Sequence, residues 1–346
     1  PLIDGVVNGC PSHLLEPQST NLVLRSEEFD NASWTKTSVS VVANDIASLD
    51  GTLNADKVSG TASFAQIQQT YTSVNDTNYT LSVFVKSPSS NEVGLRLSSG
   101  TNDVRRVFNL STLTISQMGG NNLEIIDEGI ENYGNGWYRI YLTCKSDGTS
   151  AFANIYPKNS TDGTLQFAYF YGAQLEQGSF PTSYIPNYGT AAGVTRSAET
   201  ANGSGDASTF NDSEGVLFAE ISALANDGTA RAISISDGGS SDYIQLRYHN
   251  VSNTVRFIVN SGGSTNFDYF ITLPSTLDLN KIAIKYNNTN VYLWANGIEY
   301  FQYSPITNPI GLSELAFDDG SGLNNFYGNT KQIQYYDSAL NDTDLE

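Results

Sequence analysis

The sequence predicts an all-β protein made of two consecutive antiparallel β-sandwich domains. Apolar and polar residues alternate with a period of two in many short stretches, whereas helical periodicity is almost absent. The composition agrees, because 20 Tyr and 16 Phe stand against a single Met, and aromatic side chains suit pleated strands. A chain of 346 residues also suits two domains of about 150 to 180 residues each.

Three stretches of the first half show the alternation most clearly. In the first of them Tyr79, Leu81, Val83 and Val85 share one face. Residues 136–146 and 165–176 alternate in the same way, and turn-forming segments rich in Gly, Asn, Ser and Asp separate the stretches. Many short strands at this spacing predict a β-sandwich.

A proline-stiffened segment ends this first sandwich. The last strand is expected to stop near Glu176, and Pro181 and Pro186 follow a break at Gly178. Proline fixes its own φ and favours an extended residue before it. Residues 180–186 are therefore predicted to form an extended strap whose aromatic side chains pin it to the sandwich.

The second half repeats the alternation after a change in composition. Residues 189–209 are small and contain no aromatic side chain, which is typical of an interdomain linker. Further on, Asn296-Gly297 lies between two strand-like runs and predicts a hairpin, because a type I′ turn needs positive φ at both central positions. We predict a connector (1–15), a first sandwich (16–190), a linker (191–210) and a second sandwich (211–346).

The charge of the chain argues against several partners. Lys and Arg total 17 against 36 Asp and Glu, a net charge of −19, which repels nucleic acid and anionic membranes. No apolar run is long enough to insert into a membrane. The ends at Pro1 and Glu346 are those expected of a piece of a longer protein. Cys10 and Cys144 can form a disulfide or remain two thiols.

Particular motifs in the first half carry a resemblance to a known family. Residues 14–37 (LLEPQSTNLVLRSEEFDNASWTKT), 81–86, 135–143 and 171–186 (YGAQLEQGSFPTSYIP) occur in this order. Together they resemble the jelly-roll carbohydrate-binding module of bacteriophage tail and tail-fibre proteins, a fold that also accompanies secreted polysaccharide-degrading enzymes. The resemblance covers residues 10 to 190 approximately.

The second half resembles a laminin-G/concanavalin-like sandwich. The residues that carry this resemblance are 214–222 (EGVLFAEIS), 281–300 and 328–346, the last predicted as a closing strand and a short helix capped near Asn341. The pairing of the two modules is typical of virion surface proteins. It implies a location on a virion tail or appendage, or otherwise an extracellular one, and a homo-oligomer such as a trimer.

Signals of catalysis are missing from the sequence. His13 and His249 are the only histidines and fall in different halves, and none of the GxSxG, HExxH or CxxC patterns occurs. Neighbouring carboxylates such as Asp127-Glu128 and Asp318-Asp319 arise by accident in any acidic chain, although a glycosidase also needs two. We therefore predict a protein that is not an enzyme.

Sugar binding is the function for which the sequence offers candidates. A sugar ring has an apolar face and a polar rim, so its sites combine aromatic side chains with Arg or short polar groups. Sandwich cores also need large aromatic residues, and aromatic patches also form subunit contacts, so each candidate has a structural alternative. The candidates are Trp137, Arg139, Tyr141 and Arg96, with Trp34 as a further one, in the first half, and Tyr243, Arg247, Tyr292 and Trp294 in the second.

Calcium is the metal that the resemblance implies, since sandwiches of both kinds carry structural Ca²⁺ in oxygen-rich loops. A solvated acidic rim is the alternative explanation for these carboxylates. The candidate ligands are Glu28, Asp50, Asp56 and Glu176 in the first half, and Asp237 and Asp242 in the second.

We conclude from the sequence that the chain is a non-catalytic, glycan-recognising fragment of a bacteriophage tail or appendage protein. Its partners would be a host surface polysaccharide, further copies of itself and other virion proteins. The acidic surface disfavours highly anionic glycans unless Ca²⁺ bridges them. The alternatives are an accessory binding region of a secreted polysaccharide-degrading enzyme and a purely structural virion protein.

Overall fold

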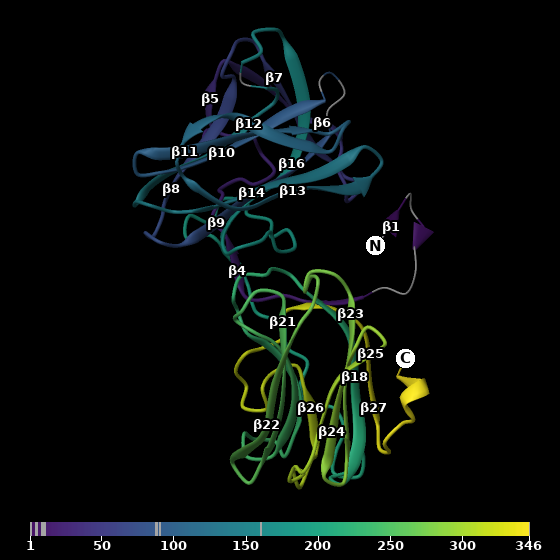
Figure 1. Ribbon diagram of the computed structural model, residues 1–346. Helices are drawn as coiled ribbons and strands as arrows, with labels where there is room; N and C mark the ends of the chain where they lie inside the picture. The colour runs from purple at the N-terminus through teal and green to yellow at the C-terminus, as the bar shows by residue number, and fades with distance from the viewer. Residues whose placement is uncertain are drawn as a thin grey trace. The chain divides into compact units, whose positions relative to one another are not determined.

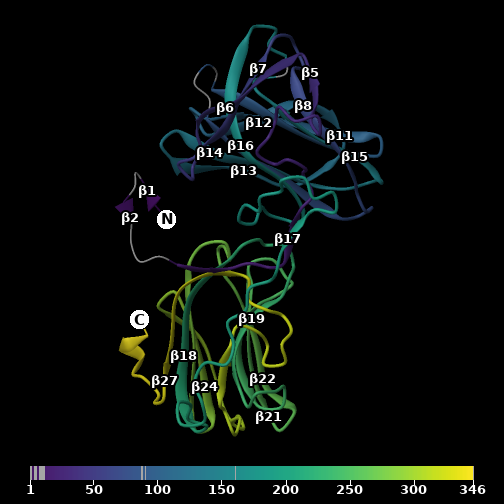
Figure 2. The same ribbon diagram turned by 180° about the vertical axis from the view of Figure 1, so that it is seen from behind.

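The computed structural model describes residues 2–3, 6–7, 12–86, 89, 91–159 and 161–345. The chain forms two compact units (Figures 1 and 2). Of the described residues, 2–3, 6–7 and 18–197 belong to the first unit, and 12–17 and 198–345 to the second. Each unit is an antiparallel β-sandwich, as the sequence predicts, and the described residues contain no α-helix.

The first unit contains two six-stranded sheets, with neighbours that are mostly distant in sequence, as in a jelly roll. A two-stranded sheet joins β4 (Ser19–Asn21) to β17 (Val194–Arg196), and another joins β1 (Leu2–Ile3) to β2 (Val6–Val7). One large sheet has the order β12 (Thr114–Asn121), β11 (Asn102–Asn109), β10 (Glu92–Ser99), β15 (Ser150–Tyr156), β8 (Gln66–Thr72), β5 (Thr35–Thr37). The other has the order β13 (Glu124–Gly134), β14 (Trp137–Lys145), β9 (Asn78–Lys86), β16 (Gln166–Gln177), β7 (Leu53–Gly60), β6 (Val39–Ala47).

The core of the first unit lies between these two sheets. Leu81, Val83 and Val85 of β9 point into it, as the alternation predicts, and Trp34 is buried there as well. The Trp34 indole packs on Phe29 with ring centroids 5.2 Å apart and donates its Nε1–H to the carbonyl of Arg25. Trp34 is therefore a core residue.

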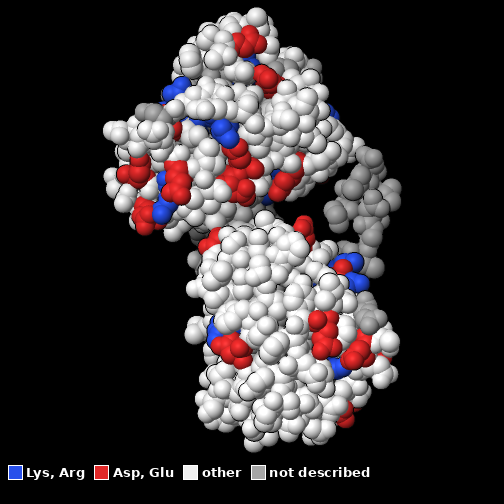
Figure 3. Space-filling model, viewed as in Figure 1, with Lys and Arg blue, Asp and Glu red and all other residues white. Residues whose placement is uncertain are grey.

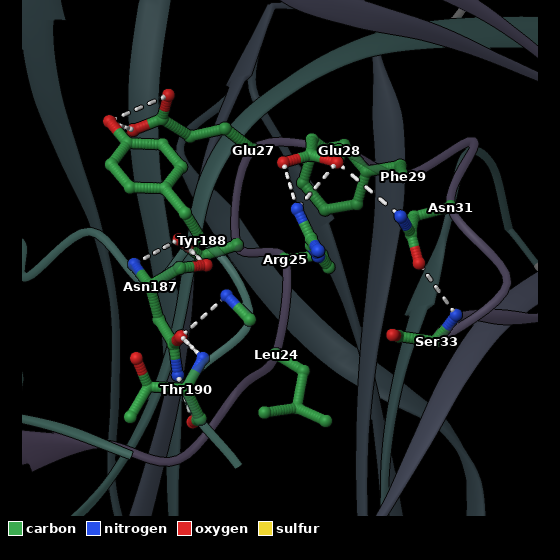
Figure 4. A network of polar contacts seen from close by, with 12 residues as sticks. Leu24, Arg25, Glu27, Glu28, Phe29, Asn31, Ser33, Asn187, Tyr188 and Thr190 are labelled. Atoms are coloured by element: carbon green, nitrogen blue, oxygen red, sulfur yellow. Dashed lines mark hydrogen bonds and ion pairs between the residues drawn. The ribbon is translucent and has the colours of Figure 1, made fainter.

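The outer face of the sheet that contains β9 is covered by the predicted strap. Thr182, Ile185 and Asn187 are buried, and the Tyr184 hydroxyl lies 2.6 Å from Ser26 Oγ. Figure 4 shows the residues that follow the strap, where Tyr188 reaches a Glu27 carboxylate oxygen at 3.4 Å. Tyr184 also packs against Phe84 and Tyr171, so this aromatic residue holds the strap against the sandwich as expected.

The second unit has a six-stranded and a five-stranded sheet, followed by a 3₁₀ turn, η1 (Asp342–Asp344), where the sequence predicts a short helix. The first sheet has the order β25 (Ile298–Tyr303), β24 (Asn290–Ala295), β23 (Asn280–Asn287), β18 (Glu214–Ala223), β27 (Gly328–Tyr336), β3 (His13–Leu15). The second has the order β22 (Ser264–Thr272), β21 (Thr254–Ser261), β20 (Tyr243–Tyr248), β19 (Arg231–Ser236), β26 (Glu314–Ala316).

Local signals in this unit agree with the structure. Asn296 and Gly297 join β24 to β25 with φ of 53° and 78°, the positive values that a type I′ turn needs. No helix in the described part of the chain is long and apolar enough to span a membrane.

The predicted boundaries differ from the structure at both ends of the first sandwich. His13–Leu15, expected in a connector, forms β3 and pairs with β27 of the second unit. The expected linker is divided: Val194–Arg196 pairs with β4 of the first unit, whereas Phe210 lies in the core of the second. Both segments are only three residues long, so nothing in their composition reveals their distant pairing partners. Cys144 is buried, while Cys10 lies outside the described residues and its pairing stays a prediction.

Candidate functional site

A pocket lies on the outer face of the six-stranded sheet in the second unit. Four outward-facing residues form one row across four neighbouring strands: Trp294 on β24, Ala283 on β23, Phe218 on β18 and Gln334 on β27. Ala283 is the small member of this row. Its methyl group leaves room between the larger Trp294 and Phe218, so the row itself creates a hollow.

Polar side chains surround this hollow. The next row along the strands contains Lys281, Glu220 and Gln332, and Glu220 forms an ion pair with Lys331 at 2.8 Å. The pocket has a volume of about 220 Å³. It is lined by Phe218, Glu220, Lys281, Ala283, Trp294, Gly297, Gln332, Gln334, Tyr336, Leu340, Asp344 and Leu345.

The C-terminal turn forms one wall of the pocket and is fixed by a buried lysine. Lys285 Nζ lies 4.4 Å from the ring centroid of Tyr292, donates to the carbonyl of Leu340 at 3.3 Å, and forms an ion pair with Asp342. Figures 1 and 2 show the turn on the outer side of the sheet, beside β27. Lys285 thus holds the residues that supply Leu340, Asp344 and Leu345 to the pocket.

Trp294 contributes an unused hydrogen-bond donor. Its side chain is 5% exposed, and its Nε1–H is buried without an acceptor among the described residues. Buried polar groups normally have a partner, since an unpaired one costs free energy. Tyr292, the other candidate on this strand, also faces outward but is engaged by the Lys285 ammonium group.

Tyr243 and Arg247 lie elsewhere in the second unit. They face outward from β20 in the other sheet, where they share a face with Gln245. The structure therefore divides the four predicted residues of this unit between two sites, one on each sheet.

In the first unit, the predicted sugar platform is covered. Trp137 is 3% exposed and packs with Ala55, Phe84 and Tyr171. Arg139 is also buried, beneath the strap. Its guanidinium donates to Ser82 Oγ at 3.0 Å and to the carbonyl of Thr182 at 2.7 Å. The expectation of open faces at Trp137 and Arg139 does not hold, because strand alternation reveals which side chains point outward and not whether a later segment covers them.

The remaining two candidates of the first unit also have internal partners. Tyr141 donates to Asp127 Oδ2 at 3.1 Å, and burial together with that carboxylate raises the pKa of Tyr141. Arg96 lies in the other sheet and forms an ion pair with Asp103 at 2.7 Å. The structure thus does not bring Arg96 together with the three candidates on β14.

The four carboxylates expected to bind calcium are not gathered at one site. Glu28 pairs with Arg25 at 3.1 Å (Figure 4). Asp56 accepts the backbone N–H groups of Phe29 and Asn44, each at 2.8 Å. Asp50 accepts from Ser48, Thr52 and Tyr171.

Glu176 has four internal donors. Ser19 Oγ, Gln174 Nε2, and the Thr182 backbone N–H and hydroxyl lie 2.5 to 2.9 Å from its oxygens. In the second unit Asp242 accepts from the backbone of Gly262 and Ile310, and Asp237 from that of Gly239. Among the described residues no three His, Cys, Asp or Glu side chains are grouped so as to hold a metal ion. The described carboxylates thus do not form a ligand set for calcium, and calcium binding stays a prediction.

The first unit has a hollow of its own, of about 330 Å³, near Asp76, Glu124, Lys145 and Asp147. Its lining is polar except for Leu123 and contains no aromatic ring. It lacks the apolar wall that a sugar ring needs, so the Trp294 pocket is the stronger candidate.

Phe218, Glu220, Gln334 and Tyr336 are pocket residues that the sequence candidates do not include. The alternation in residues 214–222 places Phe218 and Glu220 on the outward face of a strand. Their proximity to Trp294 depends on the pairing of β18 with β23 and of β23 with β24, which a single sequence does not reveal.

Comparison with known proteins gives only distant structural similarity. No family model matches the chain, and no curated protein matches it. A carbohydrate-binding module of the Ruminococcus gnavus IT-sialidase, described as CBM40, is similar at 18% identity over 42% of this chain and 91% of its own, with a TM-score of 0.33. A toad ovary galectin in complex with thio-digalactose is similar at 8% identity over 40% of this chain and 99% of its own, with a TM-score of 0.30.

A third similar structure is a pair of mouse laminin α1 domains, LG4-5. Its identity is 9%, over 99% of this chain and 95% of that one, with a TM-score of 0.31. These structures illustrate β-sandwich folds of the carbohydrate-binding, galectin and laminin-G types.

Proposed function

We propose that the chain is a non-catalytic glycan-binding protein and that the Trp294 pocket holds one saccharide unit. The observation that carries this proposal is the combination, in one pocket of about 220 Å³, of an apolar wall with a polar rim. Phe218, Ala283 and Trp294 supply the wall, against which the C–H face of a sugar ring can pack. Glu220 and Gln334 supply groups that hydrogen-bond to hydroxyls.

The size of the pocket sets the kind of ligand. Pockets for drug-sized molecules measure about 300–1,000 Å³, so this smaller one suits a single ring or the end of a chain. One weakly held ring gains strength when several copies of the protein bind one polysaccharide. Recognition of a repeating surface glycan by a homo-oligomer, such as a trimer, is consistent with such a site.

Within this proposal, the setting is a bacteriophage tail or appendage that attaches to a host polysaccharide, together with other virion proteins. This part rests on the sequence resemblance of residues 14–37 and 171–186 alone. Location on a virion, or otherwise outside the cell, is part of the same proposal.

Filling the pocket tests the binding proposal. Ala283→Leu places a larger apolar side chain between Trp294 and Phe218 without removing a core contact. The matched control is Ala192→Leu, the same change at an exposed position of the first unit. A glycan array with the intact chain identifies ligands, and calorimetric titration measures their affinity.

We expect Ala283→Leu to abolish binding to the array ligands, whereas Ala192→Leu leaves the affinity unchanged. If no host-surface polysaccharide binds the folded chain, the glycan proposal is wrong and a structural role is favoured. If ligands bind but Ala283→Leu binds them equally well, the pocket is not their site.

A further inference from the structure

The five-stranded sheet of the second unit carries two arginines side by side on its outer face. Arg247 of β20 is directly opposite Arg256 of β21. The two strands that contain them send Leu246, Tyr248, Val255 and Phe257 into the core, so both guanidinium groups lie on the other face. Like charges in this arrangement repel each other, and each needs a partner.

Arg256 has that partner within the chain. Asp268 of β22 accepts from its Nε at 2.7 Å and from its Nη2 at 2.5 Å, a bidentate pairing that suits guanidinium and carboxylate geometry. The Arg256 guanidinium also lies 5.3 Å from the ring centroid of Phe270. The charge of Arg256 is therefore already matched.

Arg247 has no such partner. It forms no hydrogen bond or ion pair with any described residue, and its Nε is buried. Every other arginine of the chain has at least one interaction partner: Arg25, Arg96, Arg105, Arg106, Arg139, Arg196, Arg231 and Arg256. In a chain with 36 acidic and 17 basic residues, this unpaired arginine is the exception.

The carboxylates near Arg247 are occupied by other groups. Asp268 is bound to Arg256, and Asp319 accepts from the backbone of Ser321 and Leu323 and from Asn324 Nδ2. Burial, followed by repulsion from Arg256, lowers the pKa of Arg247. An unpaired, partly desolvated guanidinium costs free energy, and an external anion would remove that cost.

Two more polar groups beside Arg247 lack partners. Ser234 and Gln245 are directly opposite each other on β19 and β20, and both are almost fully buried. Ser234 Oγ and Gln245 Oε1 have no hydrogen-bond partner among the described residues. Tyr243 stands next along β20 on the same face, so Arg247 is one of several polar groups gathered there.

The arginines of this face also act on a neighbouring histidine. His249 follows β20, and its pKa is lowered by burial and by the charges of Arg247 and Arg256. In the view of Figure 3, acidic and basic side chains form small separate groups with wide uncharged areas between them. Local charge on this protein therefore differs from its net charge.

We propose that Arg247, with the hydroxyl groups of Ser234 and Tyr243, forms a binding site for an oxyanion, either a carboxylate or a sulfate of the kind that acidic saccharides carry. The planar guanidinium offers parallel N–H donors that match either group. The site lies on the opposite sheet from the Trp294 pocket and does not depend on the glycan proposal for that pocket.

The test titrates the intact chain with sodium glucuronate, sodium sulfate and neutral glucose at constant low ionic strength. Backbone amide shifts of β20 and β21 in NMR spectra measure binding. Arg247→Gln removes the charge, Arg247→Lys keeps the charge without the planar donor pair, and Arg25→Gln is the matched control at a paired surface arginine of the first unit.

We expect saturable shifts with at least one of the two anions and none with glucose. Arg247→Gln should weaken anion binding by at least about tenfold, as for loss of one charge-assisted contact, and Arg25→Gln should leave it unchanged. If only glucuronate binds and Arg247→Lys fails to bind it, the site recognises a carboxylate. If only sulfate binds, it recognises a sulfate ester.

The proposal is overturned if neither anion gives saturable shifts at β20 and β21, or if Arg247→Gln binds as tightly as the unmodified chain. A melting curve of the unmodified protein gives a second readout that needs no variant. An anion bound only by the folded state raises the melting temperature with concentration, and equal curves in sulfate and in chloride of the same ionic strength would contradict a sulfate site. Failure here leaves the array result for the Trp294 pocket unaffected.

Discussion

Replacing Glu176 by glutamine is expected to destabilise the first unit strongly. Glu176 is fully buried, and its two oxygens accept four hydrogen bonds from Ser19, Gln174 and Thr182. Glutamine has nearly the same shape but replaces one acceptor oxygen by an NH₂ donor. That donor would face groups that also donate.

The magnitude follows from the number of bonds affected. Hydrogen bonds to charged groups contribute about 1.5–3 kcal/mol each, and roughly half of the four lose their acceptor. The hydroxyls of Ser19 and Thr182 can turn and accept instead, which recovers part of the loss. We therefore expect the free energy of unfolding to fall by about 2–4 kcal/mol. At about 2–4 °C per kcal/mol for a domain of this size, the transition should move down by about 5–15 °C.

Differential scanning calorimetry of the whole chain measures this shift, with Glu124→Gln as the control at an exposed position of β13. A change below about 0.5 kcal/mol, the range of ordinary surface substitutions, would refute the reasoning. Repeating the scans with EDTA separates two roles. If Glu176 only anchors the neighbouring segments, Glu176→Gln lowers the stability equally with and without EDTA. If Glu176 binds calcium, the substitution lowers the stability only when calcium is present.

Three further outcomes are expected. If calcium binds as the resemblance implies, EDTA should lower the melting temperature of the unmodified chain, and an unchanged scan would count against a structural ion. Trp137→Ala should lower the free energy of unfolding by about 3–5 kcal/mol, as for a buried tryptophan. The molecules of this variant that remain folded should still bind the glycan array. Loss of binding without loss of stability would instead favour a sugar platform at Trp137. Burial, with the nearby charge of Asp50, raises the pKa of the Glu27 carboxyl group, so the folded state binds this proton more tightly than the unfolded state does. The free energy of unfolding should therefore fall as the pH rises from about 4.5 through the raised pKa. Urea titrations at several pH values should show that fall in the unmodified chain and a smaller one in Glu27→Gln.

The sequence predicts those features that depend on nearby residues. The Asn296-Gly297 hairpin and the strap over residues 180–186 were predictable because turn chemistry and proline geometry act within a few residues. The pairing of His13–Leu15 with β27 was not predictable, since more than 300 positions separate the partners and neither segment has a distinctive composition. The predicted boundaries differ from the two structural units at these short segments for the same reason.

The candidate residues show a second limit. Alternation correctly places Arg139 and Trp294 on outward faces, but both are almost fully buried, one by the strap and the other within the outer-face cluster that includes the C-terminal turn. An outward position predicts exposure only when no later segment covers the sheet. The pocket around Trp294 depends in addition on Ala283 being opposite it, and that register is a property of the folded sheet.

Net charge is a poor guide to what a particular face of this protein binds. A charge of −19 suggests that the protein repels anions. At physiological salt, however, charges more than about 8–10 Å away are largely screened. Close to Arg247 the relevant charges are the few that touch or adjoin it. The two strands beside β20 carry no acid, and Asp268 of β22 is held by Arg256. Strand register and not composition therefore leaves one guanidinium unpaired. Anion binding by an acidic protein is then a local consequence of which strand each charge occupies, and the Arg247→Gln titration measures it directly.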